Sequence, residues 1–332
     1  MALDDIMKDK YYLADTIVDA LSNDLEALNA DLKQKFQEDL YFSIDLTLEG
    51  VRMKNAMIIH HYYAWLYKHL LAYDIKESIF FTMYNQILTS FKPYLNQEEQ
   101  AFIEAIEIND VIKQTKEIKS YITNAESRFF LDLLLKKERV KAKDYIIGLI
   151  EEGFPLQNVY LDIIQPSLYE IGRLWAMNKI MIADEHMATV ITQYVLTFLY
   201  PYIFDSKKHG KKLMAAAIGK ETHEIGIRMV ADFFELNGYQ TQYLGADMPL
   251  RALVEQAQIF KPDIIALSLT VTLYSRTLEE TIKALKNAMP EVKILIGGQG
   301  VLAYDDPLSH FMADGFAFSA DEAVKVGDSL VK

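Results

Sequence analysis

Apolar residues recur at spacings of three and four over most of the first two hundred positions, which is the pattern of amphipathic helices. Up to about residue 112, this pattern predicts helical runs over 9–32, 38–54, 60–73 and 77–95. Pro93 lies near the end of the last run and is expected to mark its exit, because proline cannot continue a helix. The pattern therefore predicts an all-α N-terminal domain over residues 1–112.

A second helical region follows over residues 118–205. Its periodic segments predict helices at 125–137, 140–153, 156–179 and 183–204. Gly153 has the position of a helix C-terminal stop, and Asp184 suits the positive end of the last helix dipole. This number of helices is enough for a four-helix bundle.

From about residue 208 the pattern changes, and short β-rich runs alternate with helices. Strands are predicted at 213–218, 240–245, 263–269, 293–298 and 315–319. The helices predicted between and after them cover about 223–237, 249–260, 276–289 and 320–331. This alternation predicts an α/β domain over residues 208–332, with a five-stranded parallel sheet and helices on both faces. Ligands of such sheets bind beyond the carboxyl ends of the strands.

Composition narrows the functional classes. The chain has 332 residues, half of them apolar, which supports several packed domains. It has no cysteine, which excludes disulfides, zinc–thiolate sites and thiol catalysis. The net charge of −13 argues against direct nucleic-acid binding, since a phosphate-binding groove needs positive charge. No apolar run is long enough to span a bilayer and no signal peptide is evident, so a cytoplasmic protein without a membrane partner is expected.

The loop "GKETHEIG", residues 219–226, follows the first predicted strand and precedes the first helix of the α/β domain. Its histidine, His223, therefore lies where such folds bind ligands. A neutral imidazole is a good ligand for cobalt or iron, and a carboxylate such as Glu221 suits its other ring nitrogen. An isolated loop histidine is more often a solvated side chain, so other features have to decide.

The spacing Glu221-x-His223-x-x-Gly226 resembles the Asp-x-His-x-x-Gly motif of cobalamin (B12)-binding domains, which have a Rossmann-like (flavodoxin-like) fold. In that family the histidine is the lower axial cobalt ligand, the acidic residue hydrogen-bonds it, and the glycine leaves room for the nucleotide tail. Ser268 in "ALSLTVT" and the double glycine in "IGGQG" match two further family positions. The resemblance implies cobalamin contacts from Thr222, His223, Ile225, Gly226, Ser268, Leu269, Thr270, Gly297, Gly298 and Gln299.

Two positions depart from the family pattern. Glu221 replaces the usual aspartate, and Thr270 replaces the common leucine two residues after the serine. The longer acidic side chain questions whether the histidine still binds cobalt. Loops of the "GERHEIG" type with glutamate are associated with one branch of the family, however.

That branch is indicated by the helical region ahead of the α/β domain, which resembles the four-helix cap over the upper cobalt face. Trp175 is followed after nine residues by Glu185 and His186, a spacing similar to that of adenosylcobalamin photoreceptors, the light-released repressors of carotenoid genes. The resemblance implies that Trp175 and Glu185 contact the adenosyl group and that His186 can bind cobalt from above after light. Ile182, one helical turn before Glu185, is expected to pack against the ligand.

The leading hypothesis is a non-enzymatic sensor that holds adenosylcobalamin between cap and sheet and responds to photolysis of the cobalt–carbon bond. The alternative is a corrinoid carrier protein for a methyltransferase system, with methylcobalamin or hydroxocobalamin as other forms of the cofactor. Caps of such carriers usually lack the Trp-x9-Glu-His spacing. A third hypothesis is a partner-binding protein that has kept the fold and lost the cofactor.

The N-terminal helices lack the winged helix-turn-helix domain of the photoreceptor repressors, since the region is acidic and has no basic recognition helix. The histidines at 60, 61 and 69 form no i, i+4 pair, which weakens a second metal or chromophore site. The aromatic run Tyr62, Tyr63, Trp65 and Tyr67 is expected in a core or an interface. Packing on the cap, contact with a protein partner or formation of a homo-oligomer is the role expected for this domain.

Overall fold

The computed structural model describes residues 3–26, 28–109, 112, 119–204, 206–220 and 222–332, without the side chain at position 23. The chain divides into two compact units, the first comprising Met1–Glu117 with Ala176–Asn178 and the second Ile118–Trp175 with Lys179–Lys332. Within the described ranges, none of the helices combines the length and apolar character that a membrane span requires.

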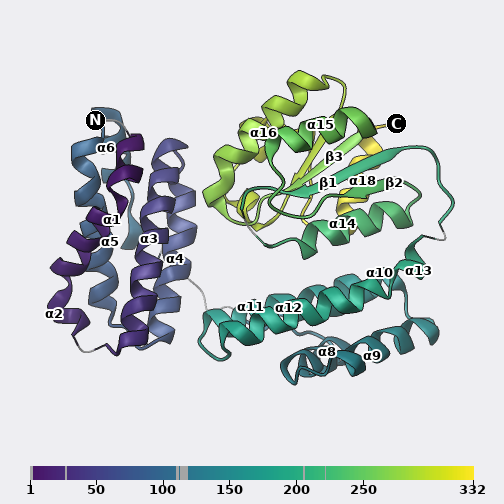
Figure 1. Cartoon of the computed structure of the whole chain (residues 1–332), viewed down its shortest axis with the longest axis horizontal. Coiled ribbons are helices and arrows are strands. Elements are labelled where there is room, and N and C mark those ends of the chain that lie inside the picture. Colours follow the sequence, from purple (N-terminus) through teal and green to yellow (C-terminus); the bar gives the residue numbers. More distant parts are fainter. Residues whose placement is uncertain (1–2, 27, 110–111, 113–118, 205, 221) are drawn as a thin grey trace. The chain divides into compact units, whose positions relative to one another are not determined.

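The first unit is helical, as predicted (Figure 1). Its elements are α1 (Leu3–Ala20), α2 (Ser22–Leu25), α3 (Ala30–Arg52), α4 (Ala56–Ala72), α5 (Glu77–Phe91), the 3-10 turn η1 (Lys92–Tyr94) and α6 (Gln97–Glu104). Helices α1 and α4 each pack against both α3 and α5, which makes a four-helix bundle. Asparagine side chains accept backbone hydrogen bonds at the starts of α3, α4 and α6, as expected of good N-caps.

Two details of this unit differ from the sequence prediction. The run predicted as one helix over 9–32 is broken after Ala20, and the next long helix begins only at Ala30, where the Asn29 side chain caps it. Helix α6 was not predicted. The exit at Pro93 is confirmed, because α5 ends at Phe91 and the proline lies in the 3-10 turn.

The aromatic run of α4 packs in the core of the first unit, as expected. Tyr62 and Tyr63 are buried, and their hydroxyls lie 2.8 Å from Ser43 Oγ and Thr47 Oγ1 of α3. His69 is also buried and stacks on Trp65 at 4.8 Å between ring centroids. Burial lowers the pKa of His69 to about 4, so its ring is neutral at physiological pH.

In the second unit, helices precede a sheet. The helical part contains α8 (Ala125–Leu135), α9 (Arg139–Glu151), α10 (Leu156–Asn158), the π-helical turn η2 (Val159–Ile164), α11 (Gln165–Ala176), α12 (Ile182–Thr197) and α13 (Tyr200–Ile203). We call residues 119–204 the cap. α8, α9 and α12 pack against one another, and α8 also packs on η2.

The predicted helix 156–179 contains a π-helical turn that the periodicity did not reveal. Pro166 lacks an N–H, so it cannot donate to the carbonyl of Asp162 as an α-helix requires. The Asn124 side-chain amide donates to that carbonyl instead, at 2.9 Å. A π turn is a usual accommodation of such a break, and it begins beside the fully buried Tyr160.

The sheet consists of five parallel strands in the order β2-β1-β3-β4-β5, which confirms the predicted flavodoxin-like α/β fold. The strands are β1 (Lys212–Ala217), β2 (Gln240–Tyr243), β3 (Ile264–Ser268), β4 (Lys293–Gly297) and β5 (Gly315–Phe316). The two edge strands β2 and β5 are shorter than predicted. The order reverses between β1 and β3, so the ligand site of such a fold is expected at their carboxyl ends.

Helices cover both faces of the sheet (Figure 1). Helices α15 (Leu250–Phe260) and α16 (Ser275–Ala288) pack together on one face, and α14 (Ile225–Leu236) and α18 (Ala320–Leu330) pack together on the other. The 3-10 turns η3 (Thr272–Tyr274) and η4 (Gln299–Ala303) and the short α17 (Pro307–Phe311) complete the domain. The apolar core runs without a break from the cap through α14 into the sheet, and Tyr160 meets Phe233 edge-on at 5.6 Å.

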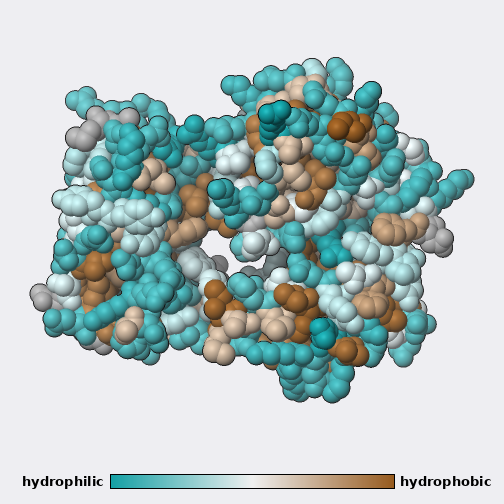
Figure 2. Space-filling view, viewed as in Figure 1, coloured by the Kyte–Doolittle hydropathy of each residue, from teal (hydrophilic) through white to brown (hydrophobic). Residues whose placement is uncertain are grey.

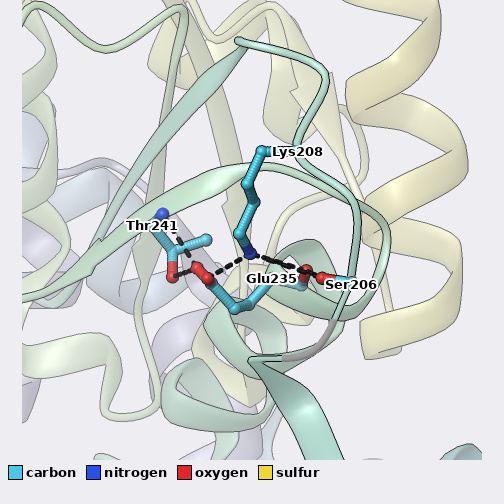
Figure 3. Close-up of polar contacts among 4 residues, drawn as sticks. All are labelled: Ser206, Lys208, Glu235 and Thr241. Carbon is cyan, nitrogen blue, oxygen red and sulfur yellow. Dashed lines mark hydrogen bonds and ion pairs between the residues drawn. The ribbon is translucent and has the colours of Figure 1, made fainter.

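A polar cluster fixes the segment between the cap and β1 (Figure 3). The buried carboxylate of Glu235, at the end of α14, forms an ion pair with Lys208 and accepts a hydrogen bond from the Thr241 amide at 3.0 Å. Ser206 Oγ donates to the Glu235 carbonyl at 2.5 Å. This cluster ties the connecting segment to α14 and β2, so the cap is anchored to the domain that it precedes.

Candidate functional site

The carboxyl ends of β1, β3 and β4 bring the predicted serine and double glycine beside the strand that precedes the predicted ligand loop. Ala217 pairs with Ser268, and Ser268 pairs with Gly297 in the parallel register. The ladder continues past the strands, since the Ile218 amide donates to the Ser268 carbonyl and the Leu269 amide to the Gly297 carbonyl, both at 2.9 Å. Three segments that are about 30 to 50 residues apart in sequence therefore form one edge, at the switch point of the sheet.

The double glycine belongs to this edge for a steric reason. Gly298 has φ +96° and ψ 160°, a region essentially restricted to glycine. A Cβ there would lie 2.4 Å from the Leu269 carbonyl oxygen and 2.9 Å from Ser268 Oγ, so no larger residue fits against β3. Gly226, by contrast, is exposed, and a Cβ there would meet nothing within 4 Å. The start of α14 thus leaves open space, as the predicted cobalamin tail requires.

The predicted ligand loop lies at this edge. His223 and Thr222 are exposed, and Ile225 is buried beneath them at the first turn of α14. Glu221, the predicted partner of His223, lies outside the described residues. Ser268 and Leu269 are buried, whereas Gln299 is exposed and Thr270 half-buried. An exposed imidazole above a glycine-lined edge is a chemically suitable lower ligand for a cobalt that arrives in its own macrocycle.

Helix α12 of the cap presents one face to this edge. Ile182, His186, Thr189 and Gln193 lie on one side of the helix because they are spaced by three or four residues. The Gln193 side-chain amide donates to Glu224 of the ligand loop at 3.0 Å. His186 lies on that face about 10 Å nearer the helix start, at 1.5 Å per residue.

The predicted cap residues themselves lie near the beginning of α12 and the end of α11. The Glu185 carboxylate lies 2.6 Å from His186 Nδ1, and the His186 side chain is 71% exposed. Ile182 is 58% exposed, and Trp175 is half-buried at the end of α11. The Asp184 carboxylate accepts from the Met181 amide at 3.0 Å and thus fixes the start of α12, as its position suggested.

Apolar side chains are exposed along this part of the cap. Hydrophobic atoms gather over α11 and α12 in the space-filling view (Figure 2). The exposed apolar residues of and just before α12 are Met181, Ile182, Met187 and Val190. Apolar residues at the start of the helix that carries His186 are suited to cover an apolar or planar ligand.

Three residues at the site were not predicted. Glu224 is held by two groups, because the Tyr243 hydroxyl donates to its second carboxylate oxygen at 2.9 Å while Gln193 donates to the first. Burial and the Glu224 carboxylate raise the pKa of Tyr243, so its hydroxyl keeps its proton. The sequence offered one signal for this contact, the glutamate beside His223 in "GKETHEIG". Its partners could not be identified from the sequence, because they lie 31 residues before it and 19 after it.

A second contact joins cap and sheet on another side of the edge. The Gln299 side-chain amide, just after the double glycine, lies 3.5 Å from the Tyr169 hydroxyl of α11. This contact and the one between Gln193 and Glu224 connect the cap to two different loops of the carboxyl edge. The described residues contain no group of three or more His, Asp or Glu side chains arranged to hold a bare metal ion.

Comparison with known families agrees with this geometry. Residues 211–325 match the family model of a B12 binding domain, and residues 130–200 match a second B12 binding domain model, which covers the cap. The two matched ranges together include the ligand loop, the serine and glycine positions, and Trp175, Glu185 and His186.

Several curated proteins are similar to parts of the chain, among them corrinoid proteins and a transcriptional repressor. Dimethylamine corrinoid protein 2 of Methanosarcina acetivorans is 29% identical over 168 residues, which is 50% of this chain and 74% of that protein. The HTH-type transcriptional repressor CarH of Myxococcus xanthus is 23% identical over 148 residues, 44% of this chain and 48% of that protein. Among solved structures, the monomethylamine corrinoid protein of Methanosarcina barkeri superposes with a TM-score of 0.55 at 20% identity, covering 61% of this chain and 96% of that one.

Proposed function

This chain is a cobalamin-binding domain protein with a helical cap ahead of its α/β domain, and we propose that it serves as a corrinoid carrier protein for a methyltransferase system. The photoreceptor hypothesis takes second place. Several of the relatives are corrinoid proteins named for methylamines, whereas the repressor is matched over less of its length.

The single observation that carries the proposal is the edge itself. Ala217, Ser268 and Gly297 lie in register at the carboxyl ends of three strands, and the loop that carries His223 follows the first of them. The α12 face with His186 is tied to this loop through the contact between Gln193 and Glu224. Bound cobalamin supplies a cobalt centre whose upper face can carry a methyl group. We assign residues 118–205 to the cap over that face, 208–332 to the cobalamin-binding domain, and 1–112 to contact with a protein partner.

The residues of the chain then have distinct roles. His223 is the lower ligand, and Gly226 leaves space beside it for the nucleotide tail. Gly298 lets the backbone after β4 pass close to Leu269, and Gly297 lets the end of β4 pass close to the Ala317 carbonyl, which keeps the edge flat enough for a large planar ligand. On the other side, Trp175 and Ile182 shield the upper face from water. Such a protein binds and presents a group, while a partner enzyme performs the transfer.

The test is cofactor loading of the purified protein with hydroxocobalamin, followed by chemical reduction and methylation with methyl iodide. A carrier should take up one methyl group per chain, keep it through gel filtration, and release it to a thiol acceptor only when a methyltransferase is added. The variant His223→Ala should bind cobalamin at least tenfold more weakly and lose the spectral signature of axial nitrogen. A wild-type protein that stays colourless after incubation with every cobalamin form would contradict the proposal.

The second candidate is the adenosylcobalamin light sensor, favoured by Trp175 and by the contact between Glu185 and His186 at the cap face. It predicts tighter binding of adenosylcobalamin than of methylcobalamin, and a change of elution volume after green illumination. His186→Ala should then alter the illuminated spectrum and leave the dark spectrum unchanged. Equal retention of both cofactors, with an unchanged elution volume in light and dark, would favour the carrier.

A further inference from the structure

Helix α14 carries polar residues on one face, all directed at the cap. Glu224 precedes the helix, and Arg228 and Asp232 follow at intervals of four residues, which places the three on one side. Each contacts a different part of the cap. Gln193 of α12 donates to Glu224 at 3.0 Å, and the Arg228 guanidinium lies 5.2 Å from the centre of the Tyr200 ring.

The third contact of this face is buried. The Tyr160 hydroxyl, in the π turn, donates to the Asp232 carboxylate at 2.9 Å, and both side chains are almost fully inaccessible. The Asp232 contact is two helical turns away from the ligand loop, whereas the Glu224 contact lies within it. The cap is therefore bound to the helix that begins two residues after His223, with one contact inside the loop and another well outside it.

The Glu224 carboxylate is held from two directions. Gln193 of α12 binds one oxygen, and Tyr243 at the end of β2 binds the other at 2.9 Å. Space for this arrangement comes from Gly245, which has φ +76°, because a Cβ there would lie 3.3 Å from Glu224 Oε2. Glu224 thus bridges a strand end of the sheet and a helix of the cap.

We infer that Glu224 is a positioning residue that couples the His223 loop to cap helix α12. The inference rests on the proposed function in that His223 must be the lower ligand. Adjacent Cα atoms are about 3.8 Å apart, so a displacement of Glu224 is passed directly to His223. The bond to Gln193 therefore makes the height of the imidazole depend on the position of α12, the helix over the upper face. Gln193 and Glu224 therefore connect the protein groups on the two sides of the cofactor.

The exchange of the two polar groups gives a sharp test. Gln193→Glu places two carboxylates face to face and breaks the contact by repulsion. In the double variant Gln193→Glu/Glu224→Gln, the new amide donates to the new carboxylate and still accepts from Tyr243, so the contact is restored. Glu224→Gln alone should be nearly neutral, because the Gln193 amide can turn and accept from it.

Each variant is loaded with hydroxocobalamin, and its affinity is measured by titration of the visible spectrum. After reduction to the Co(II) state, the nitrogen splitting in the electron paramagnetic resonance spectrum of protein labelled with ¹⁵N-histidine reports whether the imidazole is bound, because the unlabelled base of the cofactor gives a different splitting. Gln193→Glu is expected to weaken binding about tenfold and to reduce the fraction with axial nitrogen, whereas the double variant should return to within about threefold of wild type.

Tyr160→Phe is the matched control. It removes a bond between the cap and α14 that does not touch the ligand loop, so it should lower the unfolding temperature and leave the axial-nitrogen signal unchanged. If Gln193→Glu behaves like this control, Glu224 merely fastens the cap and the inference is wrong. If the wild type binds cobalamin without axial nitrogen, the assignment of His223 fails first, and the coupling fails with it.

Discussion

In the first unit, the buried tyrosines Tyr62 and Tyr63 bond to hydroxyls of the neighbouring helix α3, and the polar atoms face inward. In the second unit, Tyr160 and Tyr243 bond to carboxylates of Asp232 and Glu224, and one of these contacts lies at the edge of the sheet. The first arrangement consolidates a bundle. The second joins the cap to the sheet and leaves the side chains of His186 and His223 exposed at this junction. We place the ligand there for that reason.

The comparison predicts that equally damaging core changes have different functional effects. Tyr63→Ala and Tyr160→Ala each remove a fully buried ring and should destabilise their own unit by about 3–5 kcal/mol. Only Tyr160→Ala should also weaken cobalamin binding, because loss of the whole ring, unlike loss of the hydroxyl alone in Tyr160→Phe, loosens the cap on α14. Thermal unfolding and spectral titration of both variants check this. A loss of cobalamin affinity in Tyr63→Ala would contradict the predicted difference between the two units.

Each unit contains an aspartate whose pKa is raised to about 6, chiefly by burial: Asp232 in the second unit and Asp39 in the first. A raised carboxyl pKa means that the folded state favours the protonated form, so the stability that this group contributes is fully present below about pH 4 and is lost as the pH rises through about 6. For Asp232 the loss is up to about 3 kcal/mol, since one pKa unit is about 1.4 kcal/mol. It should be smaller for the more exposed Asp39.

Asp232→Asn and Asp39→Asn remove these dependences one at a time. Each should flatten the pH profile of only one unfolding transition between pH 4 and pH 7. The measurement is thermal unfolding over that range, monitored by circular dichroism and by calorimetry. An unchanged profile in Asp232→Asn would mean that its carboxylate is already ionised in the folded protein.

Ligand linkage should act on one unit alone. Hydroxocobalamin at about one hundred times its dissociation constant stabilises the unit that binds it by about 2.7 kcal/mol. We expect the transition of the second unit to move to higher temperature and that of the first to stay in place. Calorimetry with and without the cofactor distinguishes them. A shift of both transitions together would show that the first unit also senses the ligand.

The smallest expected effects come from single methyl groups. Gly298→Ala forces a Cβ against the Leu269 carbonyl at a positive φ, and should cost about 1–3 kcal/mol of stability as well as cofactor affinity. Gly226→Ala meets only open space, so it should leave the apo protein as stable or slightly more so, while weakening cobalamin binding. Gly172→Ala in α11, also in open space, is the control. Equal affinities for the Gly226→Ala and Gly172→Ala variants would place the nucleotide tail elsewhere.

The sequence by itself determined which segments are helices or strands, and which strand each ligand-binding motif follows. Alternating short apolar runs and helices require a parallel sheet, and "GKETHEIG" at a strand end requires an exposed histidine at the ligand edge. These conclusions follow from local periodicity and from the helical connections that consecutive parallel strands need. The π turn before Pro166 escaped it, because the freed Asp162 carbonyl is satisfied by the side chain of Asn124, on a distant segment. The interruption of the predicted helix 9–32 also escaped it, and the chain becomes a long helix again only where the Asn29 side chain caps α3.

Only the tertiary structure decided which side chains meet across the site. The register that sets Ala217, Ser268 and Gly297 in one row depends on pairing between strands tens of residues apart. The partners of Glu224 lie on a helix and a strand on opposite sides of it in the sequence, and hydrogen bonds of that kind leave no periodic trace. For the same reason, "GKETHEIG" identified a ligand loop, but the connection of that loop to the cap became visible only when the two were packed together.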